Sequence, residues 1–253
     1  MNRILFLLTI LLFSSCAKKE KSSFTITGQI ENPINNYVVL YQENDIERKT
    51  STLVDTIFLD KNGKFKAKFK TAPHYYSLSI NADKKIPLAL DHGQIVTIKI
   101  DSHDVNVTGS KDTDLLTKYE NLRVKSLDRL VNSIRKQITD ENKTENPDSK
   151  KIDSLGRLEL QNYDLHLEEL NVFIKENIGA SIALYPTSLR WKGEDNIALF
   201  DSLVNDFENR YPNLAVTKKL REKVTRLQQT SIGGKVPSIV MNTVNNNTVS
   251  LFS

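Results

Sequence analysis

Cysteine is nearly absent from this chain, because its 253 residues include only one, Cys16. An internal disulfide and a dithiol exchange both need two sulfur atoms, so neither can occur within the chain. Glycine is sparse as well: the nine glycines are scattered, and no GxGxxG or GxxxxGK loop occurs to bind a phosphate. These shortages exclude a redox dithiol and a nucleotide-binding loop from the sequence as it stands.

Histidine is limited to four residues, and none of them stands four positions from another. The HExxH motif is therefore missing, and no serine lies in the GxSxG context of a nucleophile elbow. His92 and His103 could meet across a sheet with Asp91 or Asp101, but exposed turn residues are the commoner explanation of such a pattern. The sequence thus predicts no catalytic residue, no cofactor-binding residue and no metal site.

A strong excess of either charge is also lacking. Lysine and arginine total 35 against 31 aspartates and glutamates, a net charge of +4, and the two signs are interspersed, as in REKVTR. A nucleic-acid-binding protein usually concentrates its basic residues on one face, so we expect no nucleic-acid partner. The 39% of hydrophobic residues is enough for a real core, and the length suits one large domain or two modest ones.

The first sixteen residues have the form of an export signal. A basic start, MNR, precedes the apolar run ILFLLTILLF, which is shorter than the ~20 residues of a membrane span. The following LFSSC resembles a bacterial lipobox, although Phe13 stands where leucine is usual. We therefore predict a signal peptide over 1–15 and a lipidated Cys16 within a tether over 16–23. A plain secretory signal with an incidental cysteine is the alternative.

This reading predicts a membrane-anchored lipoprotein of the bacterial cell envelope. A multiply acylated cysteine is a firm anchor, because each buried CH2 contributes ~0.8 kcal/mol. The tether AKKEKSS lacks an acidic run, which favours a location facing the periplasm over one at the cell surface. The expected partners are therefore the membrane, through the lipid, and a protein client in the periplasm.

Residues 24–110 carry the pattern of short β-strands. Phe65, Ala67 and Phe69 alternate with lysines, as in a strand with one buried face. About eight such segments at 8–12-residue spacing predict an antiparallel β-sandwich. The turn signal DKNG at Asp60–Gly63 predicts a hairpin between the segments on either side of it, and DHGQ at Asp91–Gln94 predicts another tight turn.

From residue 111 to about 230 the apolar period becomes helical. We expect a first helix capped by Asp112 or Thr113 and a second that ends near Gly179. A short helix over SIALY would be disturbed at its end by Pro186. Two further helices follow, over EDNIALFDSLVNDFENR and AVTKKLREKVTRLQQ. The predicted fold class is therefore α+β, a β-sandwich followed by an all-α segment.

Two features of the helical segment are candidates for a site. Trp191, beside Arg190, could form a surface for stacking a ligand or partner, but a tryptophan that closes a helical core is more common. Glu168 and Glu169 are adjacent on a helix, point in different directions and so do not form an acid–base pair. Core packing is the expected role of the apolar stripes.

The arrangement resembles that of a known group of lipoproteins. The lipobox, FTITGQIENP, DTIFLDKNGKFKAKF and IPLALDHGQIVTIKID are similar to the N-terminal domain of unknown function in Bacteroidota lipoproteins that end in a thioredoxin-like (AhpC/TSA, TlpA/ResA-type) domain. The stretch FIKENIGASIALYPTSLRW resembles their helical linker. Within 231–253, Gly233, Val236 and Pro237 resemble the entry to the thioredoxin-like domain, and NNNTVSL resembles its first hairpin.

The resemblance implies a thiol-disulfide oxidoreductase whose WCxxC dithiol would lie beyond Ser253. We therefore expect 231–253 to be the start of a truncated thioredoxin-like domain, and the chain to be the accessory region of such an enzyme without being an enzyme itself. A free-standing periplasmic binding or scaffold lipoprotein is the alternative. A hydrolase that works through scattered carboxylates is a third, poorer hypothesis, and it requires a pocket that groups titratable residues.

Overall fold

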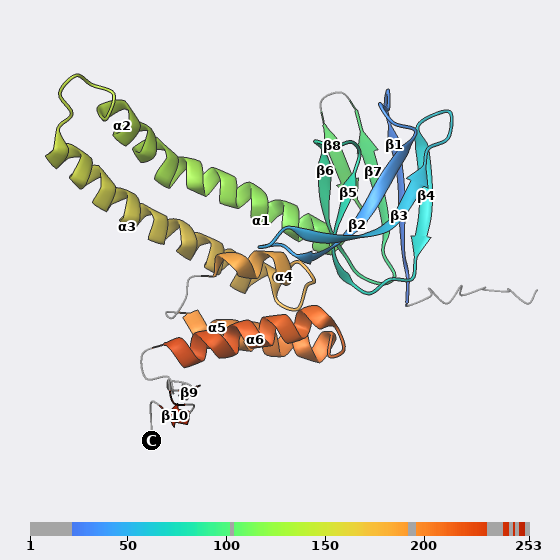
Figure 1. Ribbon diagram of the computed structural model, residues 1–253. Helices are drawn as coiled ribbons and strands as arrows, with labels where there is room; N and C mark the ends of the chain where they lie inside the picture. Colours follow the sequence, from blue (N-terminus) through green and yellow to red (C-terminus); the bar gives the residue numbers. More distant parts are fainter. Residues whose placement is uncertain are drawn as a thin grey trace, which may run out of the picture.

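The computed structural model describes residues 22–101, 104–191, 196–231, 240–242, 245 and 248–250. A β-sandwich forms one end of the molecule, a helical body lies beside it, and a long helical hairpin projects away from both (Figure 1). The α+β fold class predicted from the sequence is therefore confirmed: strands occupy the first part of the described chain, and helices follow them.

Two four-stranded sheets form the sandwich within the described residues. The first has the strand order β4-β1-β7-β8, built from Lys64–Phe69, Phe24–Ile30, Ile95–Ile100 and Val105–Thr108. The second has the order β3-β2-β5-β6, built from Thr50–Phe58, Tyr37–Asp45, His74–Ser79 and Lys85–Leu90. All of these pairs are antiparallel except β1 with β7, which run parallel. The antiparallel prediction thus holds for most of the sandwich, while the first sheet is mixed.

Alternate side chains of the strands fill the space between the sheets. Phe24 of β1 contacts Tyr76 of the opposite sheet, with ring centroids 5.3 Å apart, and Ile26 and Ile98 are fully buried in the same cluster. Burial of each such side chain stabilises the fold by about 1.5–3 kcal/mol. The alternation recognised in the sequence is therefore the pattern that builds this core.

The turn at Asp60–Gly63 does not close a hairpin, so that prediction was wrong. The turn itself forms: Gly63 has φ +71°, and the Asp60 carboxylate accepts hydrogen bonds from the amides of Asn62 and Lys64 at 2.8 and 2.9 Å. However, β3 before the turn pairs with β2, whereas β4 after it pairs with β1 in the other sheet. Turn residues determine where the chain reverses, but partner strands are chosen by packing between the sheets.

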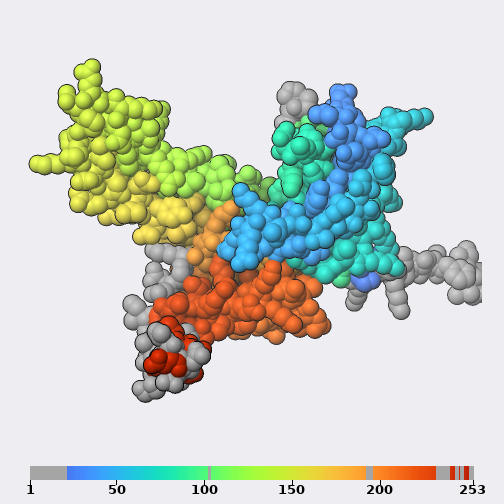
Figure 2. Space-filling view, in the orientation of Figure 1, coloured from blue at the N-terminus to red at the C-terminus, as the bar shows by residue number. Residues whose placement is uncertain are grey.

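The projecting hairpin, called the arm below, consists of two antiparallel helical segments. The first runs through α1 (Lys111–Leu127), a π-helical turn (Asp128–Asn132) and α2 (Ser133–Glu141). The second is α3 (Ser149–Phe173), which continues as a π-helical turn over Ile174–Ile178. Gly179 ends it with φ +46°, as the sequence predicted. Figure 2 shows the far part of the arm standing clear of the rest of the molecule.

The start of α1 differs from the prediction. Ser110 is the N-cap, because its side chain accepts a hydrogen bond from the Thr113 amide at 3.0 Å. Asp112 and Thr113, the two predicted caps, lie two and three residues further on, within the first turn of α1, and are buried, with Asp112 fully so. Serine and aspartate are equally good caps, so propensity alone could not identify which residue holds the position.

The helical body comprises α4 (Leu184–Thr187), a 3-10 turn (Ser188–Arg190), α5 (Ile197–Arg210) and α6 (Ala215–Thr230). Pro186 lies inside the first turn of α4 instead of ending a helix, since a first-turn residue needs no amide hydrogen there. The α5 and α6 helices occupy the two predicted stretches. In both, the apolar stripe is buried, for example at Phe200 of α5 and Leu220 of α6.

The outer face of the second sheet joins the sandwich to the helices. On β6, Leu88 and Leu90 belong to the sandwich core, whereas Ala89 between them belongs to the helical core. Successive side chains of a strand point to opposite faces, so β6 contributes to both cores. Beyond the body, β9 (Val240–Asn242) and β10 (Thr248–Ser250) form a short antiparallel pair whose side chains are largely exposed.

Candidate functional site

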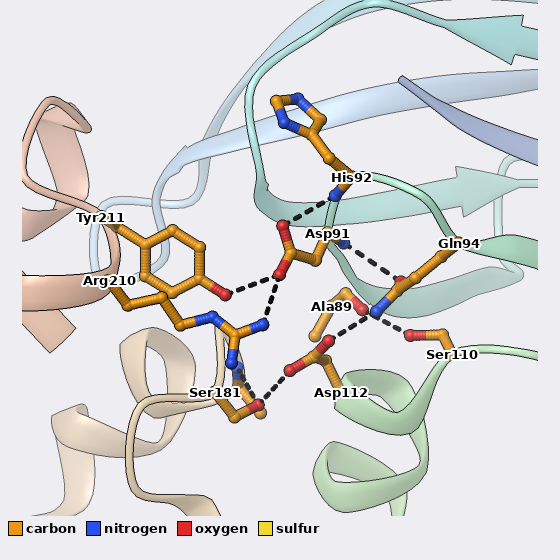
Figure 3. Close-up of polar contacts among 10 residues, drawn as sticks. Ala89, Asp91, His92, Gln94, Ser110, Asp112, Ser181, Arg210 and Tyr211 are labelled. Atoms are coloured by element: carbon orange, nitrogen blue, oxygen red, sulfur yellow. Dashed lines mark hydrogen bonds and ion pairs between the residues drawn. The ribbon is translucent and has the colours of Figure 1, made fainter. Parts of the chain in front are cut away.

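A buried polar network joins the sandwich to the helical body at the start of α1 (Figure 3). The Asp112 carboxylate accepts hydrogen bonds from the Gln94 amide and the Ser181 hydroxyl, both at 2.5 Å. Ser110 and Thr113 each donate their hydroxyl to the Ala89 carbonyl at 2.9 Å. The network therefore links β6, the following turn, α1 and the α3–α4 connection through fully formed hydrogen bonds.

A second carboxylate extends this network to α5. Asp91 lies in the turn after β6 and accepts hydrogen bonds from Arg210 and the Tyr211 hydroxyl, each at 2.8 Å (Figure 3). Burial raises the pKa of Tyr211, and the hydrogen bond to Asp91 raises it further. Tyr211 is therefore un-ionised at neutral pH and acts as a donor. Asp91 and Asp112 both accept hydrogen bonds from the helical part of the chain or from the turn beside it. We call this network the polar joint between the sandwich and the helices.

The long β2–β3 hairpin makes a separate contact with the helices. The Asn44 carbonyl near its tip accepts hydrogen bonds from the Tyr185 hydroxyl at 3.2 Å and the Lys219 ammonium at 2.7 Å. These donors come from α4 and α6. The sandwich is thus held to the helical body at two separated places, which resists rotation of one against the other.

The arm carries an unusual amount of exposed apolar surface. Six apolar side chains along α1 and α3 are between 40% and 70% exposed: Val124, Leu158, Leu160, Tyr163, Leu165 and Val172. On one side of the arm, a groove of about 500 Å³ is lined by Leu165, Val172 and Phe173 together with acidic residues. Leu165 and Val172 come together at this groove, and exposed apolar surface gathered in one place is typical of interaction sites.

A chain of three side chains crosses the inside of the arm. Ser126 donates its hydroxyl to Glu169 at 2.5 Å, and His166 Nδ1 lies 3.0 Å from the same serine oxygen. Because the serine proton is already donated to the carboxylate, Nδ1 must carry the hydrogen of the His166–Ser126 bond. The serine is not activated by a base, so these residues do not form a nucleophilic triad.

The ionisation of these groups follows from their surroundings. The Ser126 hydrogen bond, with help from Arg129, lowers the pKa of Glu169, which is therefore a carboxylate at neutral pH. Burial lowers the pKa of His166 in spite of the nearby Glu169 charge. The imidazole is therefore neutral, with a hydrogen on Nδ1 and an unprotonated Nε2 that can accept a hydrogen bond.

The structure places the candidate residues of the sequence analysis in different surroundings. Cys16 and His103 lie outside the described residues. His92 does not face a metal cluster: its Nε2 lies 3.0 Å from the Thr71 carbonyl. Glu168 and Glu169 border the same groove, but Glu169 is held by Ser126 and Arg129. No acid–base pair results.

Trp191 closes the helical core, the commoner of the two roles predicted for it. It is 8% exposed and stacks on Phe200, with ring centroids 4.0 Å apart and planes 8° apart. It also lines a second cavity of the arm together with Arg190, and Lys223 Nζ lies 5.6 Å from the centre of its ring. Trp191 therefore closes the helical core and also borders a cavity in which a ligand could be bound.

No group of three or more histidines, cysteines, aspartates or glutamates among the described residues is placed to hold a metal ion. Nor does any helix in these parts of the chain have the length and apolarity needed to cross a bilayer.

Comparison with protein families identifies part of the chain. Residues 24–116 match the family model of DUF4369, a domain of unknown function. The chain therefore contains a DUF4369 domain. The DUF4369 domain covers the whole sandwich and the first turn of α1, and hence Asp91, Ser110 and Asp112. Their partners Ser181 and Arg210 lie outside it. No curated protein matches the chain.

The polar joint of the DUF4369 domain was missed by sequence reasoning. The sequence predicts Asp112 only as a possible helix cap, and Asp91 only as a turn residue and a possible companion of His92. A carboxylate buried between two domains leaves no periodic signal, because it occupies a single position. The one available signal was that Asp112 falls at the boundary where the β pattern becomes helical.

Proposed function

We propose that this protein is the lipid-anchored, periplasm-facing accessory region of a thiol-disulfide oxidoreductase-type lipoprotein, and that its arm holds a protein client. The observation that carries this proposal is the arm itself. It projects from the body (Figures 1 and 2) and keeps exposed leucine, valine and tyrosine side chains along its length. Such side chains gain free energy when a partner covers them, about 25 cal/mol per Å² of apolar surface buried.

The sandwich is fixed to the helices at two places, the Asp112–Asp91 network and the Asn44 contact, so the arm can hold a client in a defined direction. The sandwich begins at Phe24, directly after the proposed tether. Eight residues from Cys16 to Ser23 reach at most about 28 Å when extended. A lipid on Cys16 would therefore keep the DUF4369 domain close to the membrane.

The link to oxidoreductases rests on the resemblance described above, while the DUF4369 match supports only the presence of a domain of unknown function in the N-terminal part. The chain contributes no dithiol, since it has one cysteine. We therefore expect it to bind and orient a client without exchanging disulfides. Addition of the purified chain to a disulfide-reduction assay should leave the rate unchanged.

Photo-crosslinking in cells tests the client-holding role. A photoreactive phenylalanine would replace Leu165 or Val172 in the groove of the arm and, as a matched control, Phe58 on β3, which is 69% exposed. We expect a discrete crosslinked protein from the arm positions and none from position 58. Equal products from all positions, or none from the arm, would reject the role.

Fractionation tests the anchor separately. We expect Cys16→Ser to move the protein from the membrane to the soluble fraction of the cell envelope, because the thiol is the proposed site of acylation. A variant that stays in the membrane fraction would show that the cysteine does not carry the anchor.

A free-standing binding or scaffold lipoprotein is the second candidate. It is favoured by the two hydrophobic cores. Within the described residues, the last residue of either core is Val224, so the sandwich and the helices pack on each other without residues 240–250. The identity of the crosslinked protein separates the two functions. A client that carries a disulfide or a dithiol supports the oxidoreductase role, whereas clients without paired cysteines support the scaffold.

A further inference from the structure

A second cavity lies against the arm where it meets the helical body. It has a volume of about 480 Å³, within the range of ~300–1,000 Å³ usual for small-ligand sites. Its lining comes from both helical segments of the arm and from the turn before Trp191. Leu127, Leu160, Leu167 and Leu189 provide an apolar wall. A ligand here would bury an apolar group among these leucines.

The charged residues around this cavity give it an excess of positive charge. Arg123, Arg135 and Arg190 line it. Arg123 and Arg190 share one carboxylate, Glu120, at 2.6 and 3.5 Å, and Arg135 pairs with Glu159 at 2.7 Å. Three guanidinium groups therefore meet two carboxylates. Each guanidinium has five N–H donors, so donors remain for an anion of the ligand, and a carboxylate matches their forked geometry.

His166 supplies a hydrogen-bond acceptor at the same cavity. Its ring lines the space, its Nδ1 hydrogen is directed to Ser126, and its Nε2 is unprotonated. Among the described residues, no donor lies within hydrogen-bonding distance of Nε2. A well-matched ligand would therefore carry an N–H or O–H group in addition to its anion.

Two buried polar side chains, one in the wall of the cavity and one on α3, lack partners within the described part of the chain. The Trp191 Nε1–H has no acceptor, and neither atom of the Asn171 amide forms a hydrogen bond. Asn171 is 3% exposed and lies one helical turn beyond Leu167, on the same face of α3. A buried unpaired polar group costs about 1–3 kcal/mol. An unpaired buried donor in the wall of a cavity, as at Trp191, is a group whose hydrogen bond a ligand can supply.

We propose that this cavity binds the C-terminal residue of a polypeptide that ends in an apolar side chain. The terminal carboxylate pairs with Arg123 and Arg190, which already meet at Glu120. The amide N–H of the last residue donates to His166 Nε2, and the apolar side chain packs on the leucines. A fatty acid would satisfy the arginines and leucines but has no donor for His166. The inference rests on the proposed client-holding function, since it assigns the part of the client that the arm recognises.

The only tryptophan of the chain makes binding measurable, because Trp191 lines the cavity. Titration of the full chain would follow its fluorescence with an acetylated tripeptide that ends in leucine. We expect a saturable change, and at least tenfold weaker binding of the same peptide with an amidated C-terminus. Equal binding of the amide, or no change with either peptide, would overturn the proposal.

Two further ligands distinguish the source of the carboxylate. N-acetyl-leucine has the carboxylate, the amide N–H and the side chain of one residue, and laurate has only an acid and an apolar chain. N-acetyl-leucine offers all three proposed contacts, so we expect it to bind about as tightly as the tripeptide, whereas laurate, which lacks the amide N–H, should bind more weakly. Binding of laurate as tight as that of the tripeptide, or no binding of N-acetyl-leucine, would overturn the assignment to a polypeptide end.

Variants locate the site. Arg190→Gln should weaken tripeptide binding at least tenfold by calorimetry, whereas Arg157→Gln, an exposed arginine on α3 outside the cavity, should not. Circular dichroism would establish that both variants are folded. His166→Phe should remove the preference for the tripeptide over laurate. An unchanged affinity of Arg190→Gln would overturn the proposal.

The crosslinking experiment separates this inference from the proposed function. Crosslinks from the arm without any tripeptide binding would reject this inference alone, whereas the absence of both crosslinks and tripeptide binding would reject the proposed function too.

Discussion

At the scale of single residues, the most informative position is Asp112. It is a fully buried carboxylate whose two hydrogen-bond donors come from different parts of the chain, Gln94 and Ser181. Its neighbour Asp114, in the same first turn of α1, is exposed. The two aspartates share the favourable interaction with the helix N-terminus, so a comparison between them isolates the effect of the joint.

We expect Asp112→Ala to lower the free energy of unfolding by about 2–3 kcal/mol, because two donors lose their acceptor inside the protein. Asp114→Ala should cost less than about 1 kcal/mol, the part due to the helix dipole. Urea unfolding of both variants measures the difference. Equal effects would mean that the joint contributes no stability of its own.

His74 gives the protein a pH dependence. It is 7% exposed, packs against Tyr76 and Tyr185 and has a pKa lowered from the usual 6.5, mainly by burial. The unfolded chain therefore binds a proton at higher pH than the folded one. The contribution of neutral His74 to the free energy of unfolding is therefore complete above pH 6.5. It is lost as the pH falls toward the lowered pKa of the folded state.

We expect His74→Phe to lose less unfolding free energy than the wild type between pH 7.5 and pH 5.5. Thermal melts at several pH values within this window would measure the slope. Part of the slope should remain, since burial lowers the pKa of His166 in the same direction. Parallel slopes in the two proteins would show that His74 does not contribute.

At the scale of elements, two glycines occupy contrasting positions. Gly109 joins β8 to α1 with φ +90°, and an added Cβ would lie 2.0 Å from the Ile95 carbonyl oxygen. Gly156 is in the middle of α3, where a Cβ would meet nothing within 4 Å. The first is required by the geometry of the connection, and the second weakens a helix.

We expect Gly156→Ala to stabilise the protein by about 0.5–1 kcal/mol, since alanine is the better helix former. Gly109→Ala should destabilise it by more than about 2 kcal/mol, because both the backbone conformation and the contact become strained. Differential scanning calorimetry would register opposite shifts of the melting temperature. Shifts of the same sign would contradict the assignment of the two roles.

At the scale of the whole molecule, the arm and the body differ in how many buried contacts hold them. The helical core takes Leu116 and Tyr119 from α1 and Leu170 from α3, all near the base of the arm. Residues further out, such as Val131 and Ile134, are buried only within the arm. Local opening is easiest where few buried contacts must be broken.

Hydrogen exchange on the full chain should therefore show lower protection for amides of Val131–Leu158 than for those of β1, β7 and α5. Protection of the outer arm should rise when the tripeptide fills the cavity, because Arg135, Glu159 and Leu160 line it. Equal protection of arm and body without ligand would indicate a single cooperative unit.

Some features of the structure could be predicted from the sequence, and others could not. The core strands and the helices α5 and α6 were predictable, because periodic burial leaves a repeated signal in the residues. Ser110 as the cap, the partner of β4 and the parallel pairing of β1 with β7 were not, because several residues or strands were locally equivalent. The joint at Asp112 and the cavity at His166 depend on residues up to 69 positions apart, which no local pattern links.

By itself, the sequence determined the fold class, the positions of most elements and the lack of a dithiol, since these follow from composition and from short-range periodicity. Only the tertiary structure decided which strands pair, which carboxylates join the DUF4369 domain to the helices, and that the arm stands free with apolar side chains exposed. The physical reason is that strand pairing and polar burial are selected by packing among distant segments, whereas helix and strand formation is selected by neighbours in the chain.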